Sequence, residues 1–245
     1  MGEFDLIHRY FTRPPGHAPH VVLGVGDDCA LLQPTPGMQW AVSSDMLVEG
    51  RHFFAGTDAA RLGHKALAVN LSDLAACGAR PAGFTLALAL PQADEAWLDA
   101  FSRGLLQLAD LHGCPLVGGD TTRGPLNICI TVFGEVPPGQ ALLRSGARPG
   151  DDIYVSGTLG DARLALSALQ GQTALPAALL HAAQLRLEQP TPRVALGMAL
   201  RGVASAALDV SDGLLGDLGH LLEASRVGAR VNTKNTTHLI AARAY

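Results

Sequence analysis

The sequence predicts an α/β protein, with some α+β character, built from two domains. Strand-like apolar segments alternate with helix-like segments through the first half of the chain, a pattern typical of sheets covered by helices. A stretch rich in proline and glycine, residues 137–150, then interrupts the pattern as linkers between folding units do. We therefore expect an N-terminal domain over residues 1–138 and a C-terminal domain over residues 149–245.

Two helices and four strands are expected in the first domain. Residues 59–76 carry apolar side chains at helical spacing, and Gly78 with Pro81 ends that pattern. Residues 95–111 are amphipathic and form the second expected helix. The expected strands are the apolar runs at residues 21–25, 40–44, 84–90 and 126–136.

The second domain is expected to open with a strand and to be mainly helical. Its expected strands are residues 152–156 and 206–210, with a third beginning at residues 228–231. Its expected helices are residues 161–169, 193–203 and 214–225, with residues 170–190 helical in part. Because so few strands do not close a sheet, we expect this domain to be incomplete.

Composition excludes several classes of protein. The chain has 245 residues, of which 48% are hydrophobic, and a formal net charge of −4. Such a chain is not disordered over most of its length, and its acidity argues against a general nucleic-acid surface. Its most apolar stretch, residues 83–91, is far shorter than the roughly 20 residues that span a bilayer. The N-terminus has no signal-peptide pattern, so we expect a cytoplasmic protein that binds neither nucleic acid nor membrane.

The common catalytic signatures are absent from the sequence. It has no HExxH, no GxSxG and no GxxxxGK followed by Ser or Thr, so a zincin, a nucleophile elbow and a P-loop are unsupported. Gly24 and Gly26 resemble the start of a dinucleotide fingerprint, but Asp27 and Asp28 follow where the backbone should approach a pyrophosphate. Two acids at this place would repel the pyrophosphate. Lys65 is interpreted as a snorkelling or salt-bridged side chain of a helix. The four cysteines form no CxxC pair and are expected to be buried free thiols.

Aspartates in small-residue or apolar surroundings are the main chemical signal. Isolated buried carboxylates are costly, so they must be protonated, paired or bound to cations. Only two lysines are present in the chain, and Mg²⁺ prefers oxygen ligands and bridges carboxylates to phosphates. The pattern therefore predicts a multi-metal phosphoryl-transfer site. The aspartates concerned are Asp27, Asp28, Asp45, Asp73, Asp120, Asp209 and Asp212.

Each of these aspartates also has a simpler explanation when taken alone. Asp212 precedes a glycine and an expected helix, where it would cap the helix, and Asp120 precedes two threonines, where it would form a turn. The same setting recurs in five separate motifs, however, which favours a shared site over coincidence.

Several motifs in a fixed order resemble a known enzyme family. They are GVGDDCALL, SSDMLVEGRHF, KALAVNLSDLAACGARP, GGDTTRGPL, RSGARPGD, VSGTLGD and DVSDGLLGDLGHL. Together they resemble thiamine-monophosphate kinase, within the wider family that includes aminoimidazole ribonucleotide synthetase. The resemblance covers about residues 2–232, and NLSDLAA joined to GGDTTRG points to the kinase among its relatives.

The resemblance implies ATP-dependent phosphorylation of thiamine monophosphate to thiamine diphosphate, by direct in-line transfer without a phosphoenzyme. It implies a substrate contact at His52 and ATP contacts at Gly119, Asp120, Arg144 and Ser211. It also implies several Mg²⁺ ions, held by Asp28, Ser43, Ser44, Asp45, Asp73, Asp120, Asp209 and Asp212.

The implied fold has two α/β domains of the aminoimidazole ribonucleotide synthetase type. The N-terminal ATP- and magnesium-binding domain contributes its mixed sheet to a barrel across a homodimer. Relatives continue with a GGEDYEL-type motif that this sequence lacks, and residues 233–245 do not fit the expected strand and loop. The C-terminal domain is therefore expected to be truncated. Two hypotheses follow: a working kinase, or a remnant that binds Mg²⁺ and nucleotide without turnover.

Overall fold

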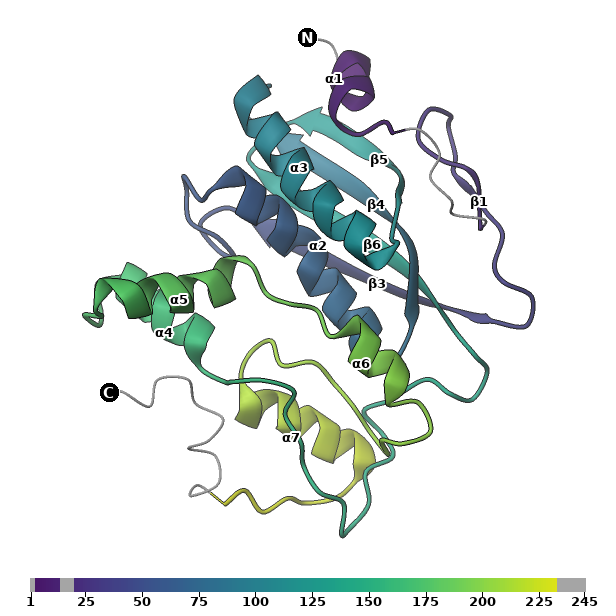
Figure 1. The fold of residues 1–245 in the computed structure, drawn as a ribbon, viewed down its shortest axis with the longest axis vertical. Coiled ribbons are helices and arrows are strands. Elements are labelled where there is room, and N and C mark those ends of the chain that lie inside the picture. The colour runs from purple at the N-terminus through teal and green to yellow at the C-terminus, as the bar shows by residue number, and fades with distance from the viewer. Residues whose placement is uncertain (1–2, 14–19, 233–245) are drawn as a thin grey trace.

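A four-stranded mixed sheet forms the centre of the computed structural model, which describes residues 3–13 and 20–232. The strands lie in the order β3-β6-β4-β5, and only β4 and β5 are parallel (Figure 1). Their bounds are Gln39–Val48 for β3, Arg80–Leu90 for β4, Leu116–Arg123 for β5 and Asn127–Val136 for β6. A separate hairpin of β1 (Val21–Leu23) and β2 (Leu31–Leu32) precedes the sheet. The expected α/β architecture of the first half is confirmed.

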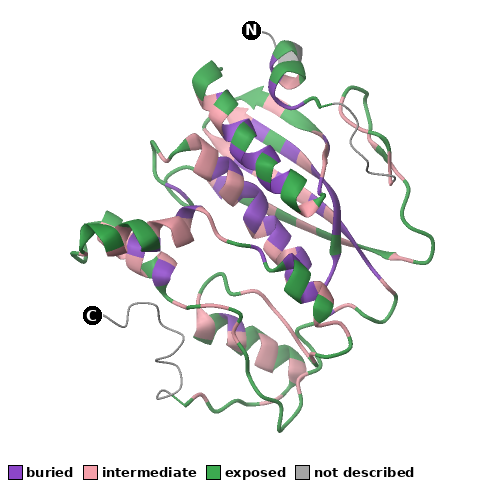
Figure 2. Ribbon diagram, in the orientation of Figure 1, coloured by how far each residue is buried: buried purple, intermediate pink, exposed green. Residues whose placement is uncertain are grey.

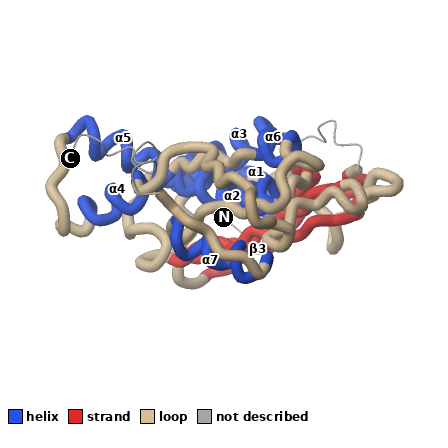
Figure 3. The backbone as a smooth tube through the Cα atoms, turned by 90° about the horizontal axis from the view of Figure 1, so that it is seen from below, coloured by secondary structure: helices blue, strands red, loops and turns tan. Residues whose placement is uncertain are grey.

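Two long helices, α2 (Ala59–Ala76) and α3 (Glu95–His112), cover one face of this sheet (Figures 1 and 3). The hydrophobic core lies between the helices and the sheet (Figure 2). Asp58 and Asp94 cap these helices by accepting hydrogen bonds from backbone amides of their first turns. A short helix, α1 (Glu3–Tyr10), precedes them in sequence and was not expected.

Glycines allow α2 and α3 to pack backbone to backbone. A Cβ atom added to Gly63 of α2 would lie 2.1 Å from the Phe101 carbonyl oxygen, and one added to Gly104 of α3 would lie 1.9 Å from the Ala60 carbonyl oxygen. Both separations are far below van der Waals contact, so each position accepts only glycine unless the helices move apart.

Along β3, the face of the sheet opposite to α2 and α3 is exposed among the described residues. Trp40, Val42 and Met46 alternate along β3 on this face, and their side chains are 37%, 58% and 52% exposed. Their neighbours in register on β6 include Phe133, which meets Trp40 edge to face. This strip of apolar side chains is called the open face below.

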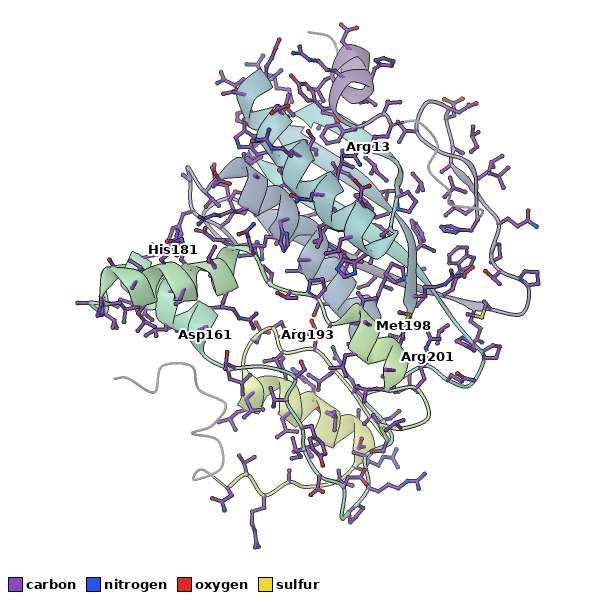
Figure 4. The ribbon with its side chains drawn as sticks, viewed as in Figure 1. Arg13, Asp161, His181, Arg193, Met198 and Arg201 are labelled. Atoms are coloured by element: carbon purple, nitrogen blue, oxygen red, sulfur yellow. The ribbon has the colours of Figure 1, made fainter. Side chains whose placement is uncertain are left out.

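Four helices make up the regular structure of the second half, within the described residues. They are α4 (Asp161–Leu169), α5 (Ala177–Glu188), α6 (Val194–Ala199) and α7 (Leu214–Ser225). Helices α4 and α5 pack together, whereas α6 packs against α2. Arg201, just after α6, donates from Nε to the carbonyl oxygen of Gly78 at the end of α2 (Figure 4). In this way the second half is attached to the first through α2.

The strands expected at residues 152–156 and 206–210 are wrong, because the structure shows irregular backbone there. Residues 228–232 are irregular as well, and the rest of the predicted tail lies outside the described residues. A strand needs a hydrogen-bonded neighbour, and within the described residues the backbone of residues 206–210 bonds to another segment only from the Ala207 amide to the Leu143 carbonyl. Strand β5 was missed, and the helix expected at 193–203 shortens to α6.

The cysteines differ from expectation in burial but not in oxidation state. All four are free thiols, yet only Cys114 is buried. Burial raises the pKa of its thiol to about 12. Cys29 lies in an exposed loop, and Cys77 lies at the C-terminal cap of α2. The side chain of Cys129 on β6 lies on the open face of the sheet. These positions explain why the three thiols are not buried. None of the helices in the described residues is both long and apolar enough to cross a membrane.

Replacing Gly104 by alanine is expected to destabilise the protein by about 1–3 kcal/mol, since the new methyl group overpacks the helix contact. Chemical denaturation monitored by circular dichroism would measure the free energy of unfolding. Gly219→Ala in α7 is the matched control, because its Cβ meets nothing within 4 Å and alanine favours a helix. An equal loss of stability in both variants would contradict the close-contact explanation.

Candidate functional site

Three carboxylates from three parts of the chain influence one another's ionisation. Asp45 lies on β3, Asp73 on α2, and Asp209 in the irregular segment before α7. Asp209 acts electrostatically on Asp45, Asp45 acts on Asp73, and Asp73 acts on Asp209. These residues are called the acidic cluster below. Their grouping is what the sequence prediction of a shared site requires.

Hydrogen bonds from α2 hold the acidic cluster together. The Ser43 hydroxyl on β3 donates to the Asp73 carboxylate. The Ser72 hydroxyl on α2 donates to the carboxylate of Asp209. Asn70, 1% exposed, accepts the backbone amide of Asp45 through Oδ1 at 3.1 Å and donates from Nδ2 to the Ala66 carbonyl. One turn of α2 thus contacts both other elements of the cluster.

Burial raises the pKa of each carboxyl group in the acidic cluster above its usual range. For Asp45, the Asp209 carboxylate raises the pKa further and His52 opposes the rise. For Asp73, Asp45 adds to the effect of burial, whereas the hydrogen bond from Ser43 and the charge of Arg144 oppose it. For Asp209, the hydrogen bond from Ser72 opposes burial and Asp73 reinforces it. The cluster therefore concentrates negative charge that is only partly balanced by cations.

His52 and Arg144 lower the pKa of carboxyl groups in the acidic cluster, His52 that of Asp45 and Arg144 that of Asp73. Arg144 lies in the proline- and glycine-rich segment between the two halves, and its side chain lowers the pKa of Asp73. His52 lies in the turn after β3, where its Nδ1 accepts the Val48 amide at 3.0 Å. Lys65 of α2 donates from Nζ to the His52 carbonyl oxygen at 2.9 Å. The lysine therefore serves as a hydrogen-bond donor within the fold, and burial lowers its pKa.

A single carboxylate oxygen organises the loop that contains Ser211 and Asp212. Oδ2 of Asp217, on α7, accepts the backbone amides of Ser211, Asp212 and Gly213 at 2.9, 3.1 and 3.1 Å. Asp217 is 7% exposed, whereas the Ser211 and Asp212 residues are exposed. Gly213 has φ +119°, which side-chain-bearing residues rarely adopt. The loop thus turns its amides inward and its side chains outward.

The structure does not bring every predicted site residue to the acidic cluster. Because side chains alternate along a strand, Ser44 points to the open face, where it hydrogen bonds to Thr131. Asp120 pairs with Ala87 at the far edge of the sheet, three strand spacings or about 14 Å from β3. Asp28 lies in the β1–β2 hairpin, which projects on the side of the molecule opposite to α4 and α5 (Figure 1).

Gly119 has a structural role that the sequence did not reveal. Its φ is +147°, and an added Cβ would lie 1.9 Å from the Leu86 carbonyl oxygen of β4. Strand β5 can therefore pair closely with β4 only if glycine occupies this position. This packing role is independent of any contact with a nucleotide.

The oxygen-rich donor set of the acidic cluster suits a hard divalent cation. Carboxylates and a serine hydroxyl are the ligand types that Mg²⁺ prefers, and a cation would relieve the mutual repulsion of the three acids. No three His, Cys, Asp or Glu side chains within the described residues stand close enough together to hold one ion. The ligand set implied by the resemblance therefore stays a prediction.

Comparison with known proteins decides the family. Residues 26–136 match the AIR synthase related protein N-terminal domain, and residues 148–243 match the corresponding C-terminal domain. The second match extends beyond residue 232, where the motif resemblance was expected to end. Thiamine-monophosphate kinase of Salmonella typhimurium is 52% identical over 232 residues, which cover 94% of this chain and 71% of that protein. The chain belongs to the thiamine-monophosphate kinase family.

Solved structures of thiamine-monophosphate kinases agree with this assignment. The enzyme from Stenotrophomonas maltophilia is 54% identical and superposes with a TM-score of 0.80, over 86% of this chain and 68% of its own. AaThiL complexed with AMPPCP and TMP is 31% identical with a TM-score of 0.73, over 79% of this chain and 62% of its own. The family and the synthetase-like fold expected from the sequence are thus confirmed.

Several residues that support this site belong to common polar types and carry no distinctive motif. Asn70 and Ser72 flank Asp73 within the NLSDLAA motif, and their proximity to it was the available signal. Asp217 stands four positions after Gly213, a helical spacing that allows a carboxylate to reach back to the preceding loop. No comparable pattern marks Ser225, whose contacts join distant parts of the chain.

Replacing Asp45 by asparagine is expected to stabilise the metal-free protein by about 1 kcal/mol at neutral pH, since it removes one of three repelling charges. Thermal unfolding in buffer containing a chelator would measure the change. Asp99→Asn on α3 is the control, because its carboxylate is exposed and paired with Arg103. A fall in the melting temperature of the Asp45 variant would contradict the repulsion inferred for the acidic cluster.

Proposed function

We propose that this chain catalyses ATP-dependent phosphorylation of thiamine monophosphate to thiamine diphosphate, by direct in-line transfer assisted by Mg²⁺ ions. The observation that carries the proposal is the convergence of Asp45, Asp73 and Asp209 beside Arg144 and His52. Family membership and the AaThiL complex with AMPPCP and TMP support the two substrates. Phosphoryl transfer of this kind depends mainly on positioning and charge neutralisation, which these residues would provide.

The residues have separate tasks in this proposal. Bound Mg²⁺ would neutralise phosphate charge and orient the transferring group. Asp45, Asp73 and Asp209 would hold the ions, and Ser43 would fix the orientation of Asp73 through its hydrogen bond. Arg144 offers a planar guanidinium with several donors to phosphate oxygens, and His52 would contact thiamine monophosphate. Ser211 and Gly119 would contact ATP, and Asp212 would complete the ion sites. Asp28, Ser44 and Asp120, which the structure places away from the acidic cluster, stay predictions of the sequence resemblance.

A second candidate is a protein that binds Mg²⁺ and nucleotide without turnover. Large apolar side chains stand exposed in the second half, among them Tyr154 at 86% and Leu215 at 77%. Exposed apolar side chains of this size are unusual in a fully packed domain and favour this alternative. The two candidates share the acidic cluster and differ in whether thiamine diphosphate is formed.

Turnover with ATP, Mg²⁺ and thiamine monophosphate separates the two candidates, with thiamine diphosphate measured by chromatography.

If the chain is a kinase, Arg144→Ala is expected to raise the KM for ATP about tenfold, since a charged hydrogen bond to phosphate is lost. The Mg²⁺ concentration for half-maximal rate is expected to change little. Arg148→Ala, an exposed neighbour in the same segment, is the control. No product from the unaltered chain, with nucleotide binding retained, would favour the second candidate.

We also propose that the protein forms a homodimer through the open face, as the family resemblance implies. The exposed strip of Trp40, Val42 and Met46 lies on the side of the sheet away from α2 and α3. Burying such a strip against a second copy would remove apolar surface from water and would complete a barrel from two sheets.

A cytoplasmic location stays a prediction from the sequence.

Val42→Asp is therefore expected to shift the protein to monomers, because it places a charge in the centre of the open face. Size-exclusion chromatography with light scattering would measure the mass of the particle. Val203→Asp is the matched control, since Val203 is 77% exposed but lies in the second half. A monomeric unaltered protein, or equal effects of both variants, would overturn the dimer proposal.

A further inference from the structure

Helix α7 contacts a loop at each of its ends, and both loops belong to the proposed nucleotide site. The loop at its N-terminal end contains Ser211, and the segment at its C-terminal end contains Arg144. These are two of the residues that would contact ATP in the proposed function. Asp217 also raises the pKa of Asp209 in the acidic cluster through its charge. The hydrogen bonds of Ser225 go to the segment of Arg144, so the Ser225 variants test positioning without altering the charge of the cluster.

The contact at the N-terminal end differs from an ordinary helix cap. A capping side chain precedes the helix and accepts amides of the first turn, whereas Asp217 is inside the helix and accepts amides of the preceding loop. Three donors converge on one buried oxygen, so the carboxylate fixes the backbone of residues 211–213 as a unit. The backbone position from which the exposed Ser211 side chain extends is thereby fixed relative to α7.

The contact at the C-terminal end spans a long stretch of sequence. The Ser225 hydroxyl donates to the Arg144 carbonyl oxygen at 2.8 Å and accepts the amides of Gly146 and Ala147 at 3.1 Å each. An added Cβ at Gly146 would lie 2.3 Å from the Ser205 carbonyl oxygen, so this segment is also held closely from its other side. The hydroxyl therefore fixes the backbone from which the Arg144 side chain extends.

Fixing these loops before the ligand arrives has an energetic consequence. A loop that is already ordered loses less conformational entropy when a ligand binds it. Misplacing the group that contacts a phosphate weakens each hydrogen bond it makes, even when that group itself is unchanged. Helix α7 thus supports the backbone at two of the four predicted ATP contacts, Ser211 and Arg144, through two polar side chains.

We propose that Asp217 and Ser225 are positioning residues for the nucleotide, one at each end of α7, an inference that rests on the proposed function. Asp217 orients Ser211 and its neighbours, and Ser225 orients Arg144. Neither residue would touch the nucleotide, and each acts through the backbone amides or carbonyl that it binds.

Titration of the full chain with AMPPCP and excess Mg²⁺ by isothermal calorimetry tests this. Asp217→Asn and Ser225→Ala are each expected to weaken nucleotide binding about tenfold, as loss of a residue supporting a ligand contact commonly does. Ser225→Thr retains the hydroxyl and is expected to restore the affinity. A merely structural loss would reduce the fraction of molecules that bind and leave the Kd of the remainder unchanged.

Two matched controls lie outside the site. Asp94→Asn removes a carboxylate that accepts the Ala96 and Trp97 amides at the start of α3. Ser102→Ala removes a helix hydroxyl that donates to the Asp99 carbonyl oxygen. Both are expected to leave the Kd for AMPPCP unchanged, and thermal unfolding would compare their stability with that of the α7 variants.

The outcomes separate this inference from the proposed function. If the unaltered chain binds AMPPCP and both α7 variants bind it with a Kd within twofold, the positioning role is overturned and the proposed function stands. If the unaltered chain does not bind AMPPCP, both are overturned. Should Asp217→Asn fail to fold, the Ser225 pair of variants decides the question alone.

Discussion

Three carboxylates that repel one another must be kept in one site, and one turn of α2 keeps them there. Asp73 belongs to this turn, Asn70 binds the backbone beside Asp45, and Ser72 binds Asp209. Removing these charges from water is unfavourable, which is why burial raises the pKa of all three. The folding free energy that holds such a cluster together must therefore come from packing elsewhere in the protein.

That packing is concentrated around α2. On one side Gly63 brings its backbone against α3, and on another Gly197 of α6 approaches so closely that a Cβ would lie 2.0 Å from the Ala75 carbonyl oxygen. Leu67 and Leu71 of α2 are fully buried beneath the helix. Close backbone contacts of this kind leave little room for displacement, because protein interiors are densely packed. The helix that carries Asp73 is thus held by close contacts with both α3 and α6.

The parts of the structure that depend on local pattern could be predicted from the sequence. Helix α2 has the bounds that its apolar spacing indicated, and α4 and α7 agree equally well. The strand expected at residues 206–210 failed because strand formation depends on a neighbour that the sequence pattern does not specify. Strand β5 was missed because its glycines and threonines resemble a loop, although Gly119 is what permits its pairing.

The sequence motifs indicated which acidic residues belong to the candidate site, but they indicated much less about how these residues are arranged in space. Motifs pointed to Asp45, Asp73 and Asp209, which the structure brings together. Successive side chains of β3 point to opposite faces of the sheet, so Ser44 lies on the face opposite to Ser43 and does not join the cluster. Some contacts could not be predicted because they depend on segments that meet only in the folded protein, as those of Asn70, Ser72 and Asp217 do. Polar residues of these types occur throughout any sequence, so their presence alone indicates no contact.

The hydrogen bond between Ser72 and Asp209 joins the two halves of the chain within the acidic cluster itself. Any rotation of the second half relative to α2 changes the separation of Asp73 and Asp209, and hence the electrostatic potential at the site. If Mg²⁺ binds there as proposed, its occupancy and the angle between the two halves would be coupled, and thermodynamic linkage would make this coupling reciprocal. In that proposal, an arrangement of the two halves that binds the ion more tightly would be stabilised by the ion to the same extent. The repulsion that costs the fold stability would then allow a bound cation to set the relative position of the two halves.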